Sequence, residues 1–346
     1  MNVIRRAGLT ATLSLATLFA VAAPAQSQSG GQSVEQFYKG KTITILLGHP
    51  PGGSYDLYAR LAADRMGKYI PGNPSIQVQY RPGGGGAIAV AYFYEQAPTD
   101  GTMMGLFAET IAHTQLTDPA IGKWKMQEMT YIGSFSGVNA AFVRRKDSPA
   151  KTVAEMREKE MNIGCSGKTS QSYQSPAVLK ALAGFKFKIA CGYPGSAEYV
   201  LALERGEVDM VSSAWNQWAS THMQKIKSGE FVPMIQSGLR RHPDLKDIPL
   251  MQELVDDPET KKVIEFTSAG AAIGRALIAP PKVPKDRIDA LRAAFDKLVK
   301  DPEFLADAKK RGAEIDPSPG VEVQKASLAI VQTPNVIVER AAKAME

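Results

Sequence analysis

Two glycine-rich turns constrain what this chain can fold into. The first spans residues 48–56 (GHPPGGSYD) and the second spans residues 81–86 (RPGGGG). Each follows a short run with β-branched residues, at 42–47 and 76–80, and each precedes a helical pattern. A strand that leads into a glycine turn and then a helix leaves backbone N–H groups free at the positive end of the helix. Two such turns in one βαβ unit share the carboxyl edge of a parallel sheet, which predicts recognition of a small anion by backbone groups.

The N-terminus predicts a signal peptide over residues 1–25. Arg5 and Arg6 form a basic segment, residues 9–22 form an apolar stretch that is short for a bilayer span, and a small-residue motif ends at Ala25. We expect export and cleavage after Ala25, with an uncleaved membrane anchor as the alternative. The formal net charge of the chain is +6, and the basic residues form no run of five or more. Nucleic acid is therefore not an expected partner.

Strands and helices alternate along the rest of the chain. The expected strands are 42–47, 76–80, 102–107, 140–143, 161–164, 187–190, 208–211 and 231–235, and the expected helices are 55–69, 87–96, 153–159, 175–183, 198–205, 285–300 and 302–311. This alternation is typical of parallel sheets in α/β layers. Two such sets and a late return of the chain predict two lobes with a cleft between them. We expect lobe 1 to comprise residues 34–136 and 237–346, and lobe 2 to comprise residues 137–236.

The two cysteines fall at related places in this pattern. Cys165 and Cys191 each lie at or just after the end of a predicted strand, with one predicted helix between them. The ends of adjacent parallel strands lie about 5 Å apart, within reach of a disulfide. An oxidising compartment would permit this bridge. Two buried free thiols that behave as small hydrophobic groups are the alternative, and the sequence leaves both open.

The sequence gives little support for known catalytic or cofactor-binding motifs. No metal-binding spacing joins the four histidines, His49, His113, His222 and His242. Residues 162–169 approach a P-loop, but Asn162 occupies the position of its first glycine. Residues 84–89 match a loose Gly-x-Gly-x-x-Ala pattern, for which an ordinary tight turn is the favoured alternative. We therefore expect no metal, no cofactor and no enzymatic activity.

Further loops rich in glycine and hydroxyl groups follow predicted strands at 166–173, 192–197 and 209–215. Hydroxyl and N–H donors at such positions can hold an oxyanion without catalysing a reaction. Each loop alone could be an ordinary turn. Their common position at the carboxyl ends of strands favours a binding site.

Three side chains in or beside these loops have two interpretations each. Asp56 either contacts the ligand or caps its own helix. Lys168 either pairs with a second carboxylate or points into solvent. Trp215 either walls the cleft or packs inside its lobe.

Several motifs carry a resemblance to a known family. Residues 41–60 resemble the opening strand and GG-x-x-D-x-x-x-R turn of the Bug-type receptors, the periplasmic solute-binding proteins of tripartite tricarboxylate transporters. Residues 80–86 are similar to the R-P-G-A-G-G loop of that family, and residues 97–102 to its A-P-x-D-G-T turn. In the second half, the resemblance continues through a Ser/Gly-rich loop at 164–172, a Y-x-G-S turn at 193–196 and G-E-V-D at 206–209.

The resemblance implies a two-lobe, type II-like α/β binding protein, in which each lobe has a central, mostly parallel sheet flanked by helices. It implies that the first-lobe loops hold a ligand carboxylate as a pincer through Gly52, Gly53, Asp56, Gly83, Gly84, Gly85 and Gly86. It implies that the distal part of the ligand contacts Ser166, Thr169, Ser170, Tyr193, Ser196 and Asp209. Neighbouring loop residues complete the candidate set: Pro51, Ser54, Gly167, Lys168 and Trp215.

The expected partners are a small organic carboxylate and the membrane subunits of a transporter, with the chain itself a monomer in the periplasm. The chain departs from the family pattern at 49–51 (HPP), at Gly84, at Lys168 and at Trp215. These departures leave the identity of the acid open. Two alternative functions remain: an exported α/β enzyme that acts on a small organic acid, and a sensor subunit that presents its ligand to a membrane kinase.

Overall fold

The computed structural model describes residues 32–346, and residues 33–346 form one compact unit. The predicted signal peptide and its cleavage site lie outside the described residues. Within the described part of the chain, no helix is both long enough and apolar enough to cross a membrane.

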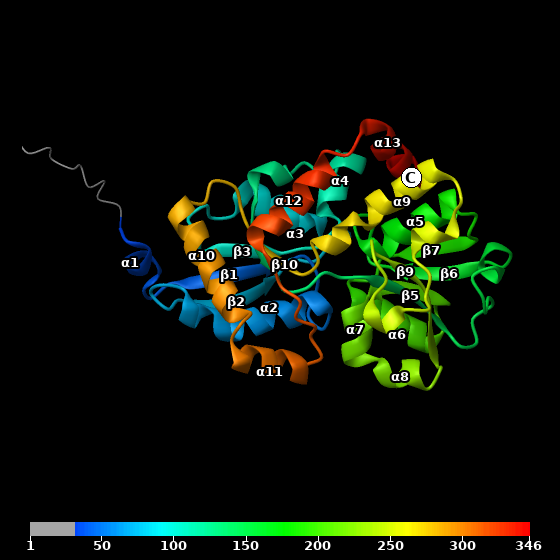
Figure 1. The fold of residues 1–346 in the computed structure, drawn as a ribbon, viewed down its shortest axis with the longest axis horizontal. Coiled ribbons are helices and arrows are strands. Elements are labelled where there is room, and N and C mark those ends of the chain that lie inside the picture. The colour runs from blue at the N-terminus through cyan, green and yellow to red at the C-terminus, as the bar shows by residue number, and fades with distance from the viewer. Residues whose placement is uncertain (1–31) are drawn as a thin grey trace, which may run out of the picture. The chain divides into compact units, whose positions relative to one another are not determined.

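Two β-sheets lie side by side in this unit (Figure 1). The first sheet has the strand order β11-β4-β10-β3-β1-β2. Its strands are β1 (Thr42–Leu47), β2 (Ser75–Tyr80), β3 (Met103–Leu106), β4 (Thr130–Ser134), β10 (Ala276–Ala279) and β11 (Ser318–Pro319). β1 pairs in parallel with β2 and β3, whereas β10 runs antiparallel to β3 and β4.

The second sheet has the strand order β7-β6-β8-β5-β9. Its strands are β5 (Ala140–Arg145), β6 (Met161–Cys165), β7 (Phe187–Cys191), β8 (Met210–Ala214) and β9 (Phe231–Ser237). β6 pairs in parallel with β7 and β8, and β5 pairs antiparallel with β8 and β9. Both sheets are therefore mixed. The antiparallel pairs involve β5, which enters directly from the first sheet, β10, which returns to it, and the short strand β11, which pairs with β4.

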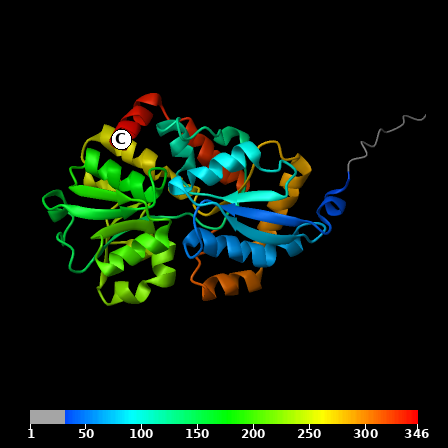
Figure 2. The same ribbon diagram turned by 180° about the vertical axis from the view of Figure 1, so that it is seen from behind.

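Helices cover both faces of each sheet, as the two opposite views show (Figures 1 and 2). The helices are α1 (Val34–Tyr38), α2 (Ser54–Arg65), α3 (Ala87–Gln96), α4 (Ile111–Thr117), α5 (Gln171–Leu182), α6 (Ser196–Arg205), α7 (Trp215–Thr221), α8 (Met223–Lys227), α9 (Pro258–Ser268), α10 (Lys285–Leu298), α11 (Pro302–Lys310), α12 (Gly320–Val331) and α13 (Asn335–Ala344). α13 contacts α4, α5 and α9, so the C-terminal helix bridges elements next to both sheets.

The alternation of side chains along β1 builds two cores, one on each face of the first sheet. Ile43, Ile45 and Leu47 join the cluster formed with α2, α10 and α11, whereas Leu46 joins the cluster formed with α3, α4 and α12. Successive side chains of a strand point to opposite faces, so an apolar strand buried on both faces needs helices on each side. The apolar and β-branched residues at 42–47 follow from this position.

Most of the elements expected from the sequence are present. β1 and α3 have the expected bounds, and most of the other expected elements differ by a few residues at their ends. The helix expected at 153–159 was wrong, because this segment forms only a 3₁₀ turn at Glu155–Arg157. Met156 is the one buried side chain in that turn. A short segment with so little apolar surface to bury gains too little from packing to extend into a helix.

A disulfide joins Cys165 to Cys191 at the ends of β6 and β7. The two residues are register partners in the parallel pair, and their Cα atoms are 4.5 Å apart. The bridge lies immediately before Ser166, so it fixes the spacing between the loops that follow the two strands.

We predict that the Cys165→Ser/Cys191→Ser double variant is less stable than the wild type by about 3 kcal/mol, the cost expected from releasing a loop of this length in the unfolded chain. Urea unfolding under oxidising conditions measures this difference. The wild type in excess dithiothreitol should match the double variant. Equal unfolding free energies in oxidised and reduced wild type would contradict the prediction.

Candidate functional site

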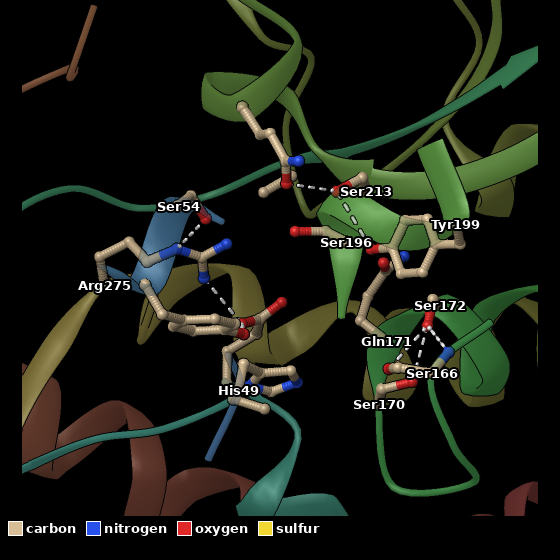
Figure 3. Close-up of a pocket in the computed structure, with 15 residues that line it drawn as sticks. His49, Ser54, Ser166, Ser170, Gln171, Ser172, Ser196, Tyr199, Ser213 and Arg275 are labelled. Atoms are coloured by element: carbon tan, nitrogen blue, oxygen red, sulfur yellow. Dashed lines mark hydrogen bonds and ion pairs between the residues drawn. The ribbon is translucent and has the colours of Figure 1, made fainter. Parts of the chain in front are cut away.

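A pocket lies between the two sheets, where loops from both of them meet (Figure 3). We call it the central pocket; the space among its lining residues is about 400 Å³, part of which is open to solvent. The residues that line it from the first sheet are His49, Ser54, Tyr55, Ala108, Glu109 and Arg275, and those from the second sheet are Ser166, Ser170, Gln171, Ser172, Ser196, Tyr199, Ser213, Ala214 and Gln217. Apart from the two alanines, every lining side chain carries a polar group.

The first-sheet side of the central pocket is built around a buried ion pair. Arg275 is 2% exposed and Glu109 is 6% exposed. Arg275 Nη1 donates to Glu109 Oε2 at 2.9 Å, and Arg275 Nε donates to Ser54 Oγ at 2.9 Å. The Tyr55 hydroxyl donates to the same Glu109 oxygen at 2.7 Å, and the Arg275 guanidinium lies over the Tyr55 ring at 4.1 Å. Ser54, Tyr55 and Glu109 together hold the guanidinium in one orientation.

Strand register explains how Arg275 reaches this position. β10 is antiparallel to β3, with Leu277 opposite Leu106. The same register carried beyond both strands puts Arg275 level with Ala108, next to Glu109. The start of β10 therefore shares a sheet edge with the carboxyl ends of β1 and β3, although Arg275 and Glu109 are 166 residues apart in sequence.

Arg275 keeps its charge in this buried position. Burial lowers the pKa of Arg275, but the Tyr55 and Glu109 groups beside it raise the pKa by more, so the net shift is upward. A buried charge is tolerated when it is paired and hydrogen-bonded. The central pocket thus contains one positive and one negative side chain that neutralise each other.

Histidine 49 also borders the pocket, with its ring stacked on that of Tyr55 at 4.8 Å between centroids. Burial lowers the pKa of His49 to about 4. The imidazole is therefore neutral at neutral pH and adds no charge to the site.

The second-sheet side of the pocket presents hydroxyl groups. Ser172 Oγ lies 2.7 Å from Ser170 Oγ and accepts from the Ser166 backbone N–H at 3.2 Å. The Tyr199 hydroxyl, from α6, donates to Ser213 Oγ in β8 at 3.2 Å. Burial raises the pKa of Tyr199 to about 12, so its phenol stays protonated. These side chains face Arg275 and Ser54 across the pocket (Figure 3).

Three helices begin at the central pocket. α2 begins at Ser54, α5 begins at Gln171 after its N-cap Ser170, and α6 begins at Ser196 after its N-cap Gly195. None of the three caps uses a side chain to accept from the first helical N–H groups. Each helix N-terminus carries roughly half a positive charge. Their convergence makes the pocket attractive to an anion.

Contacts between loops of the two sheets close the pocket at its rim. Thr169 Oγ1 donates to the Gly84 carbonyl, and Thr110 Oγ1 donates to the Thr169 carbonyl at 2.6 Å. Gly85 lies so close to the second-sheet loop that an added Cβ would be 2.7 Å from Thr169 Oγ1. The second glycine turn therefore packs directly on the 167–170 loop. These contacts join the loops of the two sheets across the rim.

The structure brings some of the predicted binding residues together in the pocket and others around it. Ser54, Ser166, Ser170 and Ser196 line the central pocket. The residues that form the rim or the outside of the adjoining loops are Pro51, Gly52, Gly53, Gly83, Gly84, Gly85, Gly86, Gly167 and Thr169. A Cβ added to Gly53 would be 2.8 Å from Ser196 Oγ, which shows how closely the first turn approaches α6.

The remaining predicted residues lie away from the central pocket. Asp56 accepts from the Gly52 N–H, from Arg60 and from the Tyr80 hydroxyl, so it orders the first glycine turn. Asp209 accepts from the Asn162 N–H, at the other end of β8 from Ser213. Lys168 is exposed, Tyr193 packs on the α6 core, and buried Trp215 donates to Asp244. Their contact with a ligand stays a prediction.

Sequence reasoning missed the charged half of the site. Glu109 lies three residues after the end of the apolar strand β3, so a charged residue near the carboxyl end of a strand was an available signal. Arg275 precedes β10, and only the antiparallel register of that strand brings it to the same edge. Tyr55, Gln171, Ser172 and Ser213 fell within the predicted loops but were not singled out.

Among residues 32–346, no three His, Cys, Asp or Glu side chains gather into a group that could hold a metal ion. The polar groups of the central pocket suit an organic ligand with acidic and hydrogen-bonding groups.

Comparison with known proteins identifies the family of the chain. The family described as "Tripartite tricarboxylate transporter family receptor" (TctC) matches residues 58–333. The chain belongs to the TctC family. Two curated relatives of this TctC chain are a UPF0065 protein in the gbd 5′ region of Cupriavidus necator, 25% identical over 89% of this chain and 87% of that protein, and a UPF0065 protein of Agrobacterium vitis, 25% identical over 88% and 84%.

Solved structures support the two-lobe α/β fold of this TctC receptor. The periplasmic binding protein BugD is 21% identical and has a TM-score of 0.69, covering 89% of this chain and 98% of its own. MatC from Rhodopseudomonas palustris with bound malate is 19% identical with a TM-score of 0.68, covering 88% and 99%. A further R. palustris protein, solved with adipate, is 20% identical with a TM-score of 0.68, covering 88% and 97%. The predicted family and fold class are confirmed.

The depressed pKa of His49 predicts a pH dependence of stability. The unfolded chain takes up a proton at its ordinary pKa near 6.5, whereas the folded chain resists protonation until pH 4, so stability is lost as the pH falls from about 6.5 towards 4. Lowering the pH from 7 to 5 therefore reduces the free energy of unfolding by about 2 kcal/mol through this group.

His49→Phe keeps the ring stack on Tyr55 and removes this titration. The unfolding free energy of each protein is measured in urea at pH 7 and at pH 5. Between these two pH values, we expect the variant to lose about 2 kcal/mol less than the wild type. His113, whose pKa burial also lowers to about 4, remains in both proteins and supplies a common background. An unchanged pH dependence in the variant would rule out the buried neutral state of His49.

Proposed function

We propose that this TctC receptor captures a small organic carboxylate in the central pocket and delivers it to the membrane subunits of a tripartite tricarboxylate-type transporter. The observation that carries the proposal is the convergence of the N-termini of α2, α5 and α6 on the pocket beside Arg275. Backbone N–H groups and a guanidinium are suited to a carboxylate. The malate and adipate in two related structures have the same acid chemistry.

The proposal includes export and a cleft that opens and closes. We propose that the signal peptide is removed after Ala25, that the protein acts as a monomer in the periplasm, and that it returns its ligand unchanged. Lobe 1 then comprises residues 34–136 and 237–346, and lobe 2 comprises residues 137–236. The chain crosses between the sheets from β4 to β5 and again after β9. Rotation about these crossing segments would expose the pocket to a solute.

We propose that two groups of residues form the binding site for the acid. The first is the set of predicted serines that line the pocket, Ser54, Ser166, Ser170 and Ser196. The second is the rim formed by the glycine turns and Thr169, which excludes water when the lobes close. A closed, water-poor site strengthens each hydrogen bond to an anion.

A panel of organic acids tests the proposed function. We expect the purified mature protein to gain thermal stability with at least one mono-, di- or tricarboxylate. The gain should rise with the logarithm of ligand concentration above the dissociation constant. Mass spectrometry of the recovered ligand should return the acid unchanged. A flat response to the whole panel would refute acid binding, and a chemically altered acid would favour the exported-enzyme alternative.

Substitution of Gly85 tests the closed rim. A Cβ at this residue would be 2.7 Å from Thr169 Oγ1 and 2.9 Å from the Ser170 backbone nitrogen, so Gly85→Ala should hinder closure and weaken acid binding at least tenfold. Isothermal titration calorimetry with an acid from the panel measures the loss.

Gly184→Ala is the matched control for this experiment. Gly184 has φ 73° against 71° for Gly85, so alanine suffers similar backbone strain, of roughly 1 kcal/mol, at both sites. A Cβ at Gly184 meets no atom within 4 Å. We expect its acid affinity to match the wild type. Equal affinities in both variants would show that the rim contact does not contribute to acid binding.

A further inference from the structure

A second cavity adjoins the central pocket. It lies between α2 and α7, and we call it the outer groove; the space among its lining residues is about 690 Å³, part of which is open to solvent. Ser54 and Gln217 line both the outer groove and the central pocket. These two residues therefore form the boundary between the two spaces, with Ser54 supplied by α2 and Gln217 by α7.

Gln217 is the longer side chain at this boundary, and hydrogen bonds hold its amide in place. The residue is 4% exposed, and its Oε1 accepts from the Ser213 hydroxyl at 3.1 Å. Ser213 in turn accepts from the Tyr199 hydroxyl at 3.2 Å (Figure 3). On the α2 side, Ser54 Oγ accepts from Arg275 Nε. Both side chains of the boundary are thus fixed by partners in the central pocket.

The helix that carries Gln217 is itself anchored to both sheets. Asn216 Nδ2 donates to the Tyr58 hydroxyl of α2 at 3.2 Å, and Trp218 is fully buried in a core cluster of the second sheet. Near the end of α7, a Cβ added to Gly312 would be 2.7 Å from Ser220 Cβ. A ligand that presses on Gln217 therefore meets a boundary that does not move aside easily.

A fixed boundary limits the length of a bound acid. A ligand in the central pocket can extend towards α7 only until its chain meets Ser54 and Gln217, because extra methylene groups forced into a packed site are unfavourable. Beyond the boundary, the outer groove is lined by the guanidinium groups of Arg60 and Arg311 and by the hydroxyl groups of α7. This space suits the far end of a longer acid, above all one that ends in a second carboxylate.

We propose that Gln217 sets the maximum length of the acid that the receptor accepts, by closing the central pocket off from the outer groove. This inference rests on the proposed function, because it names the residue that selects among acids at the same site. A shorter side chain at residue 217 joins the two spaces and admits longer acids, whose far ends then lie in the outer groove.

The experiment measures affinity against chain length. Isothermal titration calorimetry of the mature protein uses the unbranched monocarboxylates from acetate to octanoate and the dicarboxylates from malonate to suberate. If none of these binds, the series starts from the acid of the wider panel that binds and extends it one methylene group at a time. We expect wild-type affinity to fall at least tenfold beyond one chain length.

The Gln217→Ala variant tests the cause of this limit. We expect the limit to rise by two or more carbon atoms and the ratio of long-acid to short-acid affinity to increase at least tenfold. A general loss of packing would weaken long and short acids alike, so the ratio separates selection from damage. Gln224→Ala removes the same atoms from a glutamine of α8 that lines neither cavity, and it should leave the limit unchanged.

A graded variant covers loss of folding. Gln217→Asn keeps the amide and shortens the side chain by one methylene group, so the limit should rise by less than in Gln217→Ala. If circular dichroism shows that the alanine variant is unfolded, the asparagine variant supplies the test.

A second substitution locates the far end of the long acid. Arg311 lines the outer groove, where it pairs with Asp64 and Asp307, and does not line the central pocket. In the folded residue-217 variant, adding Arg311→Gln should weaken a long dicarboxylate at least threefold. The monocarboxylate of the same length, which brings no second charge to the groove, should keep its affinity.

The outcomes separate the two proposals. A wild type without a length limit, or an unchanged limit in the folded residue-217 variants, overturns the role of Gln217 and leaves the carboxylate receptor in place. A dicarboxylate that loses no more affinity than the monocarboxylate on Arg311→Gln overturns the assignment of the outer groove. Failure to bind any acid, in this series or in the wider panel, overturns the proposed function itself.

Discussion

The arrangement of the site depends on one buried guanidinium, that of Arg275. Arg275 carries a full charge at 2% exposure, and such a charge is stable only where partners surround it. Glu109 supplies the opposite charge, Ser54 accepts from Nε, and the Tyr55 ring lies beneath the guanidinium plane. These residues come from three separate segments of the first sheet. Their position therefore requires the sheet edge, the first glycine turn and the start of α2 to be assembled together.

The glycine turns contribute to the site through close approach. The first turn brings α2 against Ser196 of the second sheet, and the second turn packs on the loop that holds Thr169. A side chain at either contact would hold the loops apart. The contact of the turns with a ligand as a pincer stays a prediction. The first turn delivers pocket residues, and the second turn forms the rim over them.

The sequence predicted local elements better than it predicted the charged half of the pocket. β1 and α3 were predicted with their observed bounds, because an apolar β-branched run and a glycine-to-alanine helix start are local signals. The serines at 54, 166, 170 and 196 were also found, since each follows a strand or begins a helix. Arg275 was not found, because its partner lies 166 residues away and only the direction of β10 brings them together. The supposed helix at 153–159 was wrong because it lacks a buried face.

The backbone of Arg275 is tied to the segment that leads from one sheet to the other. Its N–H donates to the Ser136 carbonyl at 3.0 Å, and its carbonyl accepts from the Phe135 N–H at 2.9 Å. In the proposed opening of the two lobes, points close to the crossing segments would travel least, whereas the contact between Gly84 and Thr169, which joins loops of the two sheets, would break. The guanidinium would then keep its place in the open receptor and meet the solute before the glycine rim re-forms.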